Sequence, residues 1–259
     1  MGLFQARVKS HVTVNETAFL LELSCPDIVD KIQPGQFVQL KCNDTLDPLL
    51  RRPFGVHKID KDNGSMFIYY GVVGVGTELL KKYKVDDKLS LIGPLGNGFE
   101  LKRNKDIVVI GGGMGIAPML FLAEELYARG NRIIVVLGAG DSEGLNIRNS
   151  FASFAEDMLL ATDDGSLGYH GLVTEPLKEL LRDKSFDMAY ACGSPEMLKG
   201  VKAIVDSANI SCQVSMEARM ACGVGVCLGC ACKGSNNDYY PKVCIDGPVF
   251  WTEEVDLNA

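Results

Sequence analysis

The chain has 259 residues, of which 47% are hydrophobic and 23% are charged, and its formal net charge is -7. This composition is that of a globular protein with enough apolar residues for two domains and a small appendage. The negative charge, without a cluster of lysines or arginines, argues against nucleic acid as a partner.

The chain shows no signal for secretion or for membrane insertion. Its first residues, MGLFQARVKS, lack the apolar core of a signal peptide. The longest apolar stretch, residues 107–123, contains four glycines and a proline, which favour a strand, a turn and a helix over a membrane span. We therefore expect a cytoplasmic protein. Because nine cysteines occur without a secretion signal, we do not expect a disulfide framework.

Short segments rich in β-branched and aromatic residues fill the first hundred positions. Thr77 and the following ELLKKY predict one helix with its cap, since Glu78 falls in the first turn. Six strands at this spacing predict an antiparallel barrel over residues 1–101. The predicted strands cover residues 4–14, 18–25, 35–42, 53–60, 65–73 and 88–96.

The pattern changes after the charged segment ELKRNKD, at residues 100–106. The strand segments are now apolar throughout, as in strands buried on both faces, and an amphipathic helix follows most of them. This order of strands and helices is typical of a doubly wound parallel sheet. We assign residues 102–212 to this α/β domain and residues 213–259 to a C-terminal segment. The predicted strands cover residues 106–112, 132–140, 158–165 and 186–194, and the predicted helices cover 117–130, 174–181 and 195–208.

A glycine-rich turn opens the α/β domain between its first strand and its first helix, at Gly111, Gly112, Gly113 and Gly115. Glycines at such a turn let the backbone approach a pyrophosphate, and the helix N-terminus supplies amide donors. A tight strand-to-helix turn also needs glycine for steric reasons alone. The spacing differs from the usual dinucleotide fingerprint, so both interpretations stay open at this stage.

Four cysteines near the C-terminus have the spacing of a plant-type ferredoxin: Cys222, Cys227, Cys230 and the distant Cys244. This spacing predicts a [2Fe–2S] cluster. A structural zinc site is the alternative, but such sites more often have two C-x₂-C knuckles or recruit histidine, and no histidine lies nearby. Cys232 either replaces Cys230 as a ligand or stays free.

Several motifs occur in the order found in the ferredoxin–NADP reductase superfamily: PGQFVQL, RRPFG, GVGTELL, GPLGNGF, GGGMGIAP and ACGSPEML. With the segment MEARMACGVGVCLGCACK, the whole chain resembles the electron-transfer subunits of two-subunit, NAD-dependent dihydroorotate dehydrogenases. The resemblance implies an FAD-binding barrel, an NAD-binding α/β domain and a small [2Fe–2S] segment.

The resemblance also implies which residues bind FAD. A guanidinium fork suits the flavin diphosphate because it offers paired donors and keeps its charge. Gly55 departs from the superfamily, where serine or threonine is common at that position. The alternative for Arg51 and Arg52 is a solvated pair at a strand edge. The implied FAD residues are Arg52, Pro53, Phe54, Gly55, Tyr69, Tyr70, Gly71, Gly76 and Thr77.

For NAD, the resemblance places the nicotinamide over the glycine-rich turn, with Cys192 and Gly193 beside it. Buried packing is the alternative role for Cys192. Asp141 stands where a carboxylate accepts ribose hydroxyls, and the first positions of that loop hold no arginine to receive a 2′-phosphate, which favours NADH over NADPH. Asp141 as a simple turn residue is the other interpretation.

The implied function is electron transfer in pyrimidine (UMP) biosynthesis, from an FMN-containing catalytic subunit through the cluster and FAD to NAD⁺. Because cofactors carry this chemistry, we propose no catalytic side chain. We expect a heterotetramer with two copies of each subunit, and a chain that oxidises NADH with artificial acceptors but does not act on dihydroorotate alone. The alternatives are a flavin subunit of an NAD(P)H:ferredoxin oxidoreductase or sulfhydrogenase-like complex, a redox sensor, and a zinc-stabilised structural subunit.

Overall fold

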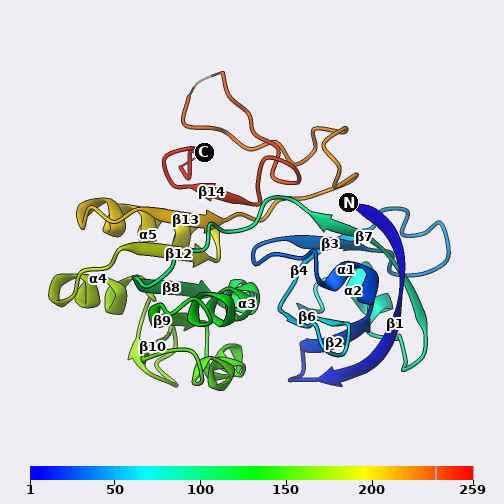
Figure 1. The fold of residues 1–259 in the computed structure, drawn as a ribbon, viewed down its shortest axis with the longest axis horizontal. Coiled ribbons are helices and arrows are strands. Elements are labelled where there is room, and N and C mark those ends of the chain that lie inside the picture. The colour runs from blue at the N-terminus through cyan, green and yellow to red at the C-terminus, as the bar shows by residue number, and fades with distance from the viewer. Residues whose placement is uncertain (237, 259) are drawn as a thin grey trace.

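Two β-sheet domains lie side by side, and the C-terminal segment extends across one end of both (Figure 1). The computed structural model describes residues 1–236 and 238–258. Within these residues, no helix has the length and apolar character needed to cross a membrane.

The first domain is a seven-stranded antiparallel sheet in the order β4-β3-β7-β1-β2-β6-β5. Alternate residues of its strands are buried, as in β7, so one face forms the domain core. The strands are β1 (Gly2–Thr13), β2 (Ala18–Ser24), β3 (Phe37–Leu40), β4 (Arg52–Gly55), β5 (Lys58–Asp60), β6 (Ser65–Gly71) and β7 (Lys88–Leu95), and the helices are α1 (Pro26–Val29) and α2 (Val75–Leu80).

The sheet has seven strands rather than the expected six because the predicted strand 53–60 divides into β4 and β5. The backbone N–H of Val56 donates to Gln36 O at 3.2 Å, whereas that of His57 donates to Phe67 O at 2.9 Å. The chain thus changes partners within two residues. Since β4 and β5 are the two edge strands, this short connection holds the edges together and rolls the sheet into a half-barrel.

The predicted helix after Thr77 begins earlier than expected, at Val75, so Thr77 lies inside its first turn instead of at the cap. The Thr77 hydroxyl accepts hydrogen bonds from the N–H groups of Val73 (2.9 Å) and Gly74 (3.2 Å) and donates to Gly74 O (3.0 Å). The Thr77 side chain therefore still caps the N-terminus of the helix, although it lies within the first turn.

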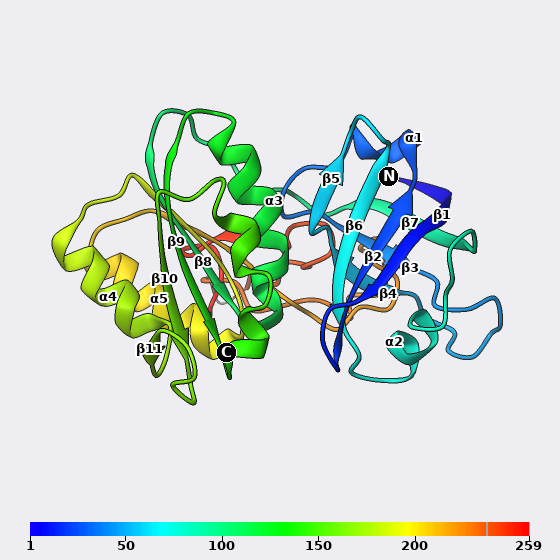
Figure 2. The ribbon, with the colours of Figure 1, turned by 90° about the horizontal axis from the view of Figure 1, so that it is seen from below.

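The second domain is a sheet in the order β11-β10-β9-β8-β12-β13-β14, parallel except for β14. Ile107 and Val109 of β8 pack with α3, whereas Val108 and Ile110 pack with α4 and α5 on the other face (Figure 2). The strands are β8 (Asp106–Gly112), β9 (Arg132–Ala139), β10 (Asp157–Thr162), β11 (Tyr169–His170), β12 (Met188–Cys192), β13 (Cys212–Ser215) and β14 (Val249–Trp251), and the helices are α3 (Ile116–Tyr127), α4 (Thr174–Asp183), α5 (Pro195–Ser207) and the short 3₁₀ turns η1 (Gly113–Gly115), η2 (Ser142–Leu145) and η3 (Arg148–Phe151).

The C-terminal segment is attached to both domains. It leaves β13 and returns as β14, which pairs antiparallel with β13 through Val214 and Phe250. It meets the half-barrel where the N–H of Asn97 donates to Gly247 O at 2.6 Å. The boundaries at residues 101/102 and 212/213 stay predictions.

Candidate functional site

Arg52, on β4, lies against the start of α2. A Cβ atom added to Gly76 would stand 2.8 Å from Arg52 Nε, so the helix start leaves room for the arginine only because residue 76 is glycine. Arg52 Nη1 donates to Leu50 O at 2.7 Å. Two parts of the predicted FAD set, widely separated in the sequence, are thus adjacent.

The neighbouring Arg51 has a different environment. Its Nη1 donates to Ser90 O at 2.8 Å and its Nη2 donates to Ser90 Oγ at 2.9 Å, which ties the β4 region to β7. Arg51 therefore links the β4 region to β7, and Arg52 is the arginine that lies beside the start of α2.

The two tyrosines of β6 point to opposite faces of the sheet. Tyr70 is 2% exposed and packs edge-on to Phe54 in the half-barrel, with ring centroids 5.7 Å apart. Its hydroxyl donates to His11 Nε2 at 2.9 Å, because His11 Nδ1 must donate to Tyr83 O. Burial raises the pKa of Tyr70. Tyr70 is thus a core residue that packs behind Phe54.

Tyr69, Gly71 and Gly55 face the second domain. The Tyr69 hydroxyl donates to Asn146 Oδ1 at 3.1 Å. A Cβ on Gly71 would stand 3.6 Å from Met114 Sδ, and one on Gly55 would stand 3.6 Å from Pro118 Cβ. These contacts bring the predicted FAD residues to the glycine-rich turn of the α/β domain.

His57 also links the two domains across their interface, which we call the seam. Its Nδ1 donates to Ala117 O, at the start of α3, at 2.6 Å. Burial lowers the pKa of His57. The ring is therefore neutral at neutral pH, with its proton on Nδ1.

A pocket of about 510 Å³ opens at the carboxyl ends of the parallel strands, where ligands bind in doubly wound folds. Close packing of its glycine turns shapes it: a Cβ on Gly115 would stand 2.5 Å from Cys192 O. The lining residues are Gly112, Gly113, Met114, Gly115, Gly138, Ala139, Gly140, Asp163, Leu172, Val173, Thr174, Gly193, Ser194, Glu196, Met197, Gly200 and Glu217.

The structure brings part of the predicted NAD set into this pocket, namely Gly112, Gly113, Gly115 and Gly193. Gly111 lies behind them on β8, where a Cβ would stand 3.0 Å from Ile116 Cα. Cys192 is 3% exposed, and burial, aided by the charge of Glu217, raises its pKa to about 12. Asp141 is not among the lining residues. Its Oδ1 accepts a hydrogen bond from Gly144 N at 2.9 Å and caps η2.

The sequence interpretation missed the acidic lining residues Asp163, Glu196 and Glu217. Asp163 directly follows β10 and Glu217 follows β13, so both lie at the carboxyl edge of the sheet. The sequence interpretation placed Asp163 inside the predicted strand 158–165, whereas the observed strand β10 ends at Thr162. Glu217 required β13, which the sequence interpretation did not identify.

The predicted cluster cysteines form two neighbouring pairs. The loop from Cys222 to Cys230 has left-handed backbone at Gly223 (φ 69°) and Gly225 (φ 81°), which turns amides inward. Val224 N donates to Cys222 Sγ at 3.4 Å, and amides of Val224 and Cys227 lower the pKa of Cys222 to about 6.

The second pair is buried below this loop. Cys230 and Cys244 contact each other through their thiols. Cys222 lies close enough to Cys244 for the two groups to interact electrostatically. Cys232 points elsewhere, with its Sγ donating to Pro241 O at 3.5 Å. Among the described residues, no three His, Cys, Asp or Glu side chains converge on one ion position. Two thiol pairs with inward amides fit a cluster of two irons, which takes four cysteines.

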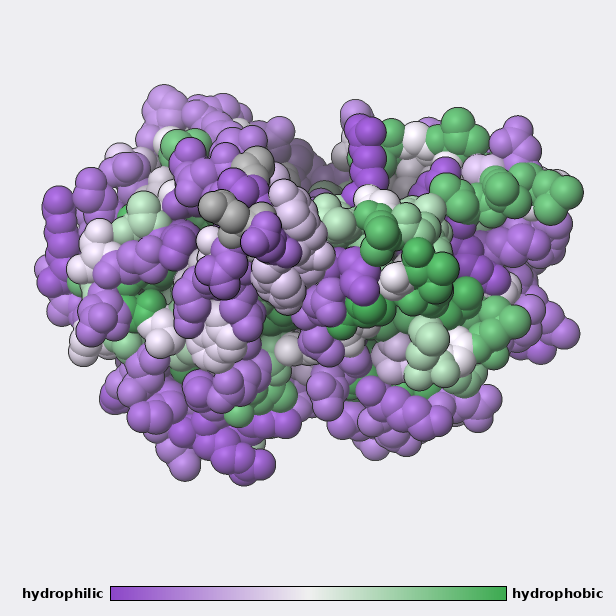
Figure 3. All heavy atoms as spheres, turned by 90° about the horizontal axis from the view of Figure 1, so that it is seen from above, coloured by the Kyte–Doolittle hydropathy of each residue, from purple (hydrophilic) through white to green (hydrophobic). Residues whose placement is uncertain are grey.

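The cluster loop rests on the strand pair that carries Arg52. Gln39 of β3 is the contact, since a Cβ on Gly223 would stand 2.6 Å from Gln39 Nε2, and Gln39 pairs with Pro53 of β4. On the outer side of the loop, Val226 is 80% and Leu228 is 63% exposed. Figure 3 looks down on the end of the molecule that carries the C-terminal segment and shows apolar residues gathered over the half-barrel side.

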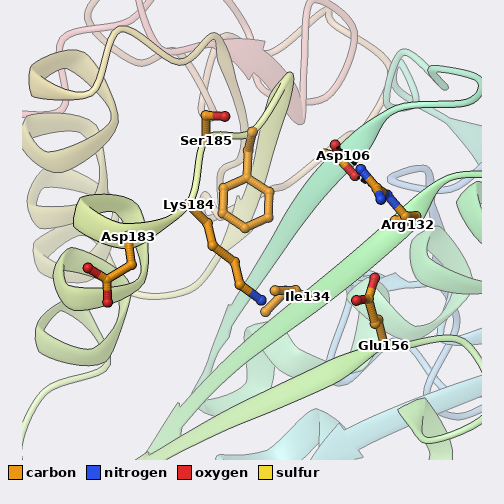
Figure 4. Close-up of a pocket in the computed structure, with 8 residues that line it drawn as sticks. Asp106, Arg132, Ile134, Glu156, Asp183, Lys184 and Ser185 are labelled. Carbon is orange, nitrogen blue, oxygen red and sulfur yellow. Dashed lines mark hydrogen bonds and ion pairs between the residues drawn. The ribbon is translucent and has the colours of Figure 1, made fainter.

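A second hollow, of about 380 Å³, lies at the opposite, amino edge of the sheet (Figure 4). The Asp106–Arg132 ion pair, with both contacts at 2.5 Å, borders it together with Glu156 and Lys184. It has no glycine turn and lies away from the seam, so it is not the nucleotide site.

Two family models match the chain. The iron-sulfur cluster binding domain of dihydroorotate dehydrogenase B matches residues 217–256, and the oxidoreductase NAD-binding domain matches residues 109–203. The chain is 38% identical over 251 residues to the dihydroorotate dehydrogenase B (NAD(+)) electron transfer subunit of Desulforamulus reducens, covering 96% of each chain. It is 41% identical over 227 residues to that of Caldanaerobacter subterraneus subsp. tengcongensis, covering 87% of each.

Solved structures share the fold. A structure of an NADH-dependent reduced ferredoxin-NADP oxidoreductase, described for flavin-based electron bifurcation, matches with a TM-score of 0.88 and 30% identity over 98% of this chain and 90% of that one. A ferredoxin NADP⁺ reductase from Neisseria gonorrhoeae with bound FAD and NADP matches with a TM-score of 0.68 and 20% identity, over 80% of this chain and 91% of that one.

Proposed function

The chain belongs to the family of dihydroorotate dehydrogenase B electron transfer subunits, and we propose that it carries electrons from a catalytic partner subunit to NAD⁺. It is an NAD-dependent oxidoreductase subunit. Contacts of the half-barrel with the α/β domain and with the C-terminal segment support this electron-transfer route. Gly71 meets Met114 on one side, and Gln39 meets Gly223 on the other, so the three predicted cofactor regions adjoin one another.

FAD suits the β4–α2 side of this seam. Arg52 would pair with its diphosphate beside Gly76, and Gly55 and Tyr69 would border the ring where they face the second domain. When bound, FAD exchanges a hydride for single electrons. The protein's part is to hold this cofactor between the nucleotide pocket and the cluster loop, with Phe54 fixed against Tyr70.

A [2Fe–2S] cluster suits the two cysteine pairs, Cys222 with Cys227 and Cys230 with Cys244. Amides of the loop stabilise the negative charge of the sulfurs, which is how a protein adjusts such a centre. Cys232 stays outside this ligand set because its thiol is engaged with Pro241 O.

NAD(H) suits the pocket at the glycine-rich turn. Gly112, Gly113 and Gly115 would admit the pyrophosphate, and Gly193 would border the nicotinamide. Asp163 lines the pocket and Asp141 does not, so we assign the ribose hydroxyls to Asp163. Its charge opposes a 2′-phosphate, which supports NADH over NADPH.

The partner is a catalytic subunit that contains FMN, and the complex has two copies of each chain. Support comes from the outer side of the cluster loop, where Val226 and Leu228 leave apolar surface next to a redox centre. Co-purification followed by assay of iron, sulfide, FAD and FMN tests the proposal. We expect two irons and one FAD for this chain and FMN with the partner. A complex without iron, or without FAD, would contradict it.

A further inference from the structure

Among the described residues that line the nucleotide pocket, three carry a carboxylate and none is a lysine or an arginine. The carboxylates are Asp163, Glu196 and Glu217. The pyrophosphate of NAD⁺ is negatively charged, so these three carboxylates do not bind it. The one positive group of the dinucleotide is its oxidised nicotinamide ring.

Strand order places two of these carboxylates at opposite ends of the pocket. Asp163 follows β10 and Glu217 follows β13, and β9, β8 and β12 lie between them. Four steps between neighbouring strands amount to about 19 Å. The glycine-rich turn after β8 falls in the middle, so a pyrophosphate held there sends the two halves of the dinucleotide in opposite directions.

Glu217 marks the end of the pocket that faces the predicted FAD residues. The chain runs from Glu217 to Met220 and Gly223, which both contact Gln39 on the β3–β4 strand pair. Glu217 is also close enough to Cys192 for its charge to raise the pKa of that thiol. The nicotinamide half therefore extends towards Glu217, and the adenosine half towards Asp163.

Glu217 is a free carboxylate in this position. Its side chain opens to the pocket, and within the described part of the chain it forms no ion pair with a lysine, arginine or histidine. Glu217 is exposed to solvent where it lines the pocket, and the protein packed near it raises the pKa of its carboxyl group by partial desolvation. A negative group without a cation of its own is suited to a positive ligand.

We propose that Glu217 binds the oxidised nicotinamide ring through its positive charge and thereby favours NAD⁺ over NADH. This inference rests on the proposed function. In that reaction the ring gains a hydride, two electrons with one proton, from the reduced flavin, which is oxidised. The ring charge falls from +1 to zero, so its attraction to Glu217 ends when the product forms. The carboxylate thus holds the substrate and lets the product leave.

The test is Glu217→Gln in the FAD- and cluster-loaded chain, with iron and FAD content measured for each variant. Calorimetry gives the NAD⁺ affinity of the oxidised chain and the NADH affinity of the fully reduced chain, each relative to the unmodified chain in the same redox state. We expect NAD⁺ affinity to fall about tenfold and NADH affinity to change less than about twofold, since the first loss corresponds to roughly 1.4 kcal/mol of charge attraction.

Two further variants make the result specific. Glu156→Gln removes one carboxylate at the opposite edge of the sheet and should change neither affinity. Glu217→Asp keeps the charge and should keep most of the preference for NAD⁺. Equal weakening of both nucleotides by Glu217→Gln, or a loss of preference in a correctly loaded Glu217→Asp, would overturn the inference. An unmodified chain that binds neither nucleotide would instead overturn the proposed function.

Discussion

Replacing Gly115 with alanine tests whether the glycine-rich turn is shaped by close backbone packing. The new Cβ would stand 2.5 Å from Cys192 O, 2.6 Å from Cys192 C and 2.7 Å from Gly193 N. All three are backbone atoms, so no side-chain rotation relieves the contact and the turns after β8 and β12 must separate. Overpacking of this kind costs up to about 3 kcal/mol. For a chain of this length, that lowers the Tm by roughly 6–12 °C.

Gly112→Ala is the matched control in the same turn. Its Cβ would meet Met197 Sδ, the end of a flexible side chain that can rotate away, so we expect a cost of about 1 kcal/mol or less. Thermal unfolding of the loaded chain gives the Tm of both variants, and calorimetry gives NAD⁺ affinity, which Gly115→Ala should reduce at least about tenfold because Gly193 moves. A Gly115→Ala chain within about 2 °C of the unmodified Tm, or a larger loss from Gly112→Ala, would refute this reasoning.

Five other substitutions test the cofactor assignments. Arg52→Ala should release FAD on gel filtration, whereas Arg51→Ala should keep FAD and lose about 1–3 kcal/mol of stability with its bonds to β7; equal FAD loss from both would remove the distinction. Cys230→Ser should abolish the visible and EPR spectra of the cluster, and Cys232→Ser should leave them intact; the reverse pattern would make Cys232 the ligand. Asp163→Ala should weaken NAD⁺ binding about tenfold and narrow the preference for NADH over NADPH, and an unchanged preference would return the role to another residue.

The local sequence pattern predicted most of the half-barrel and of the α/β domain, because alternation and buried strand runs are local properties. It did not predict the division of 53–60 into β4 and β5, which depends on hydrogen bonds of Val56 and His57 to two distant strands. Nor did it predict β14, whose pairing with β13 closes a long loop. Non-local pairing of this kind leaves little trace in a short segment.

The candidate site, too, was predictable from the sequence only in part. Glycine turns and cysteine spacing were visible in the sequence because their chemistry requires them at fixed intervals. The acidic ends of the pocket were not, since Asp163 and Glu217 become opposed only through the order of five strands. Likewise, the sequence could not tell that Tyr70 faces the core while Tyr69 faces the seam.

The most direct test of the account is to add this chain to its purified catalytic partner and follow NADH formation at 340 nm under anaerobic conditions. The substrates are dihydroorotate and NAD⁺. We predict that the partner alone forms no NADH, that the chain alone forms none, and that the two together form NADH in equal amounts with orotate. NADH formation by the partner alone, or none by the iron- and FAD-loaded complex, would contradict the central claim that this chain links the partner to NAD⁺.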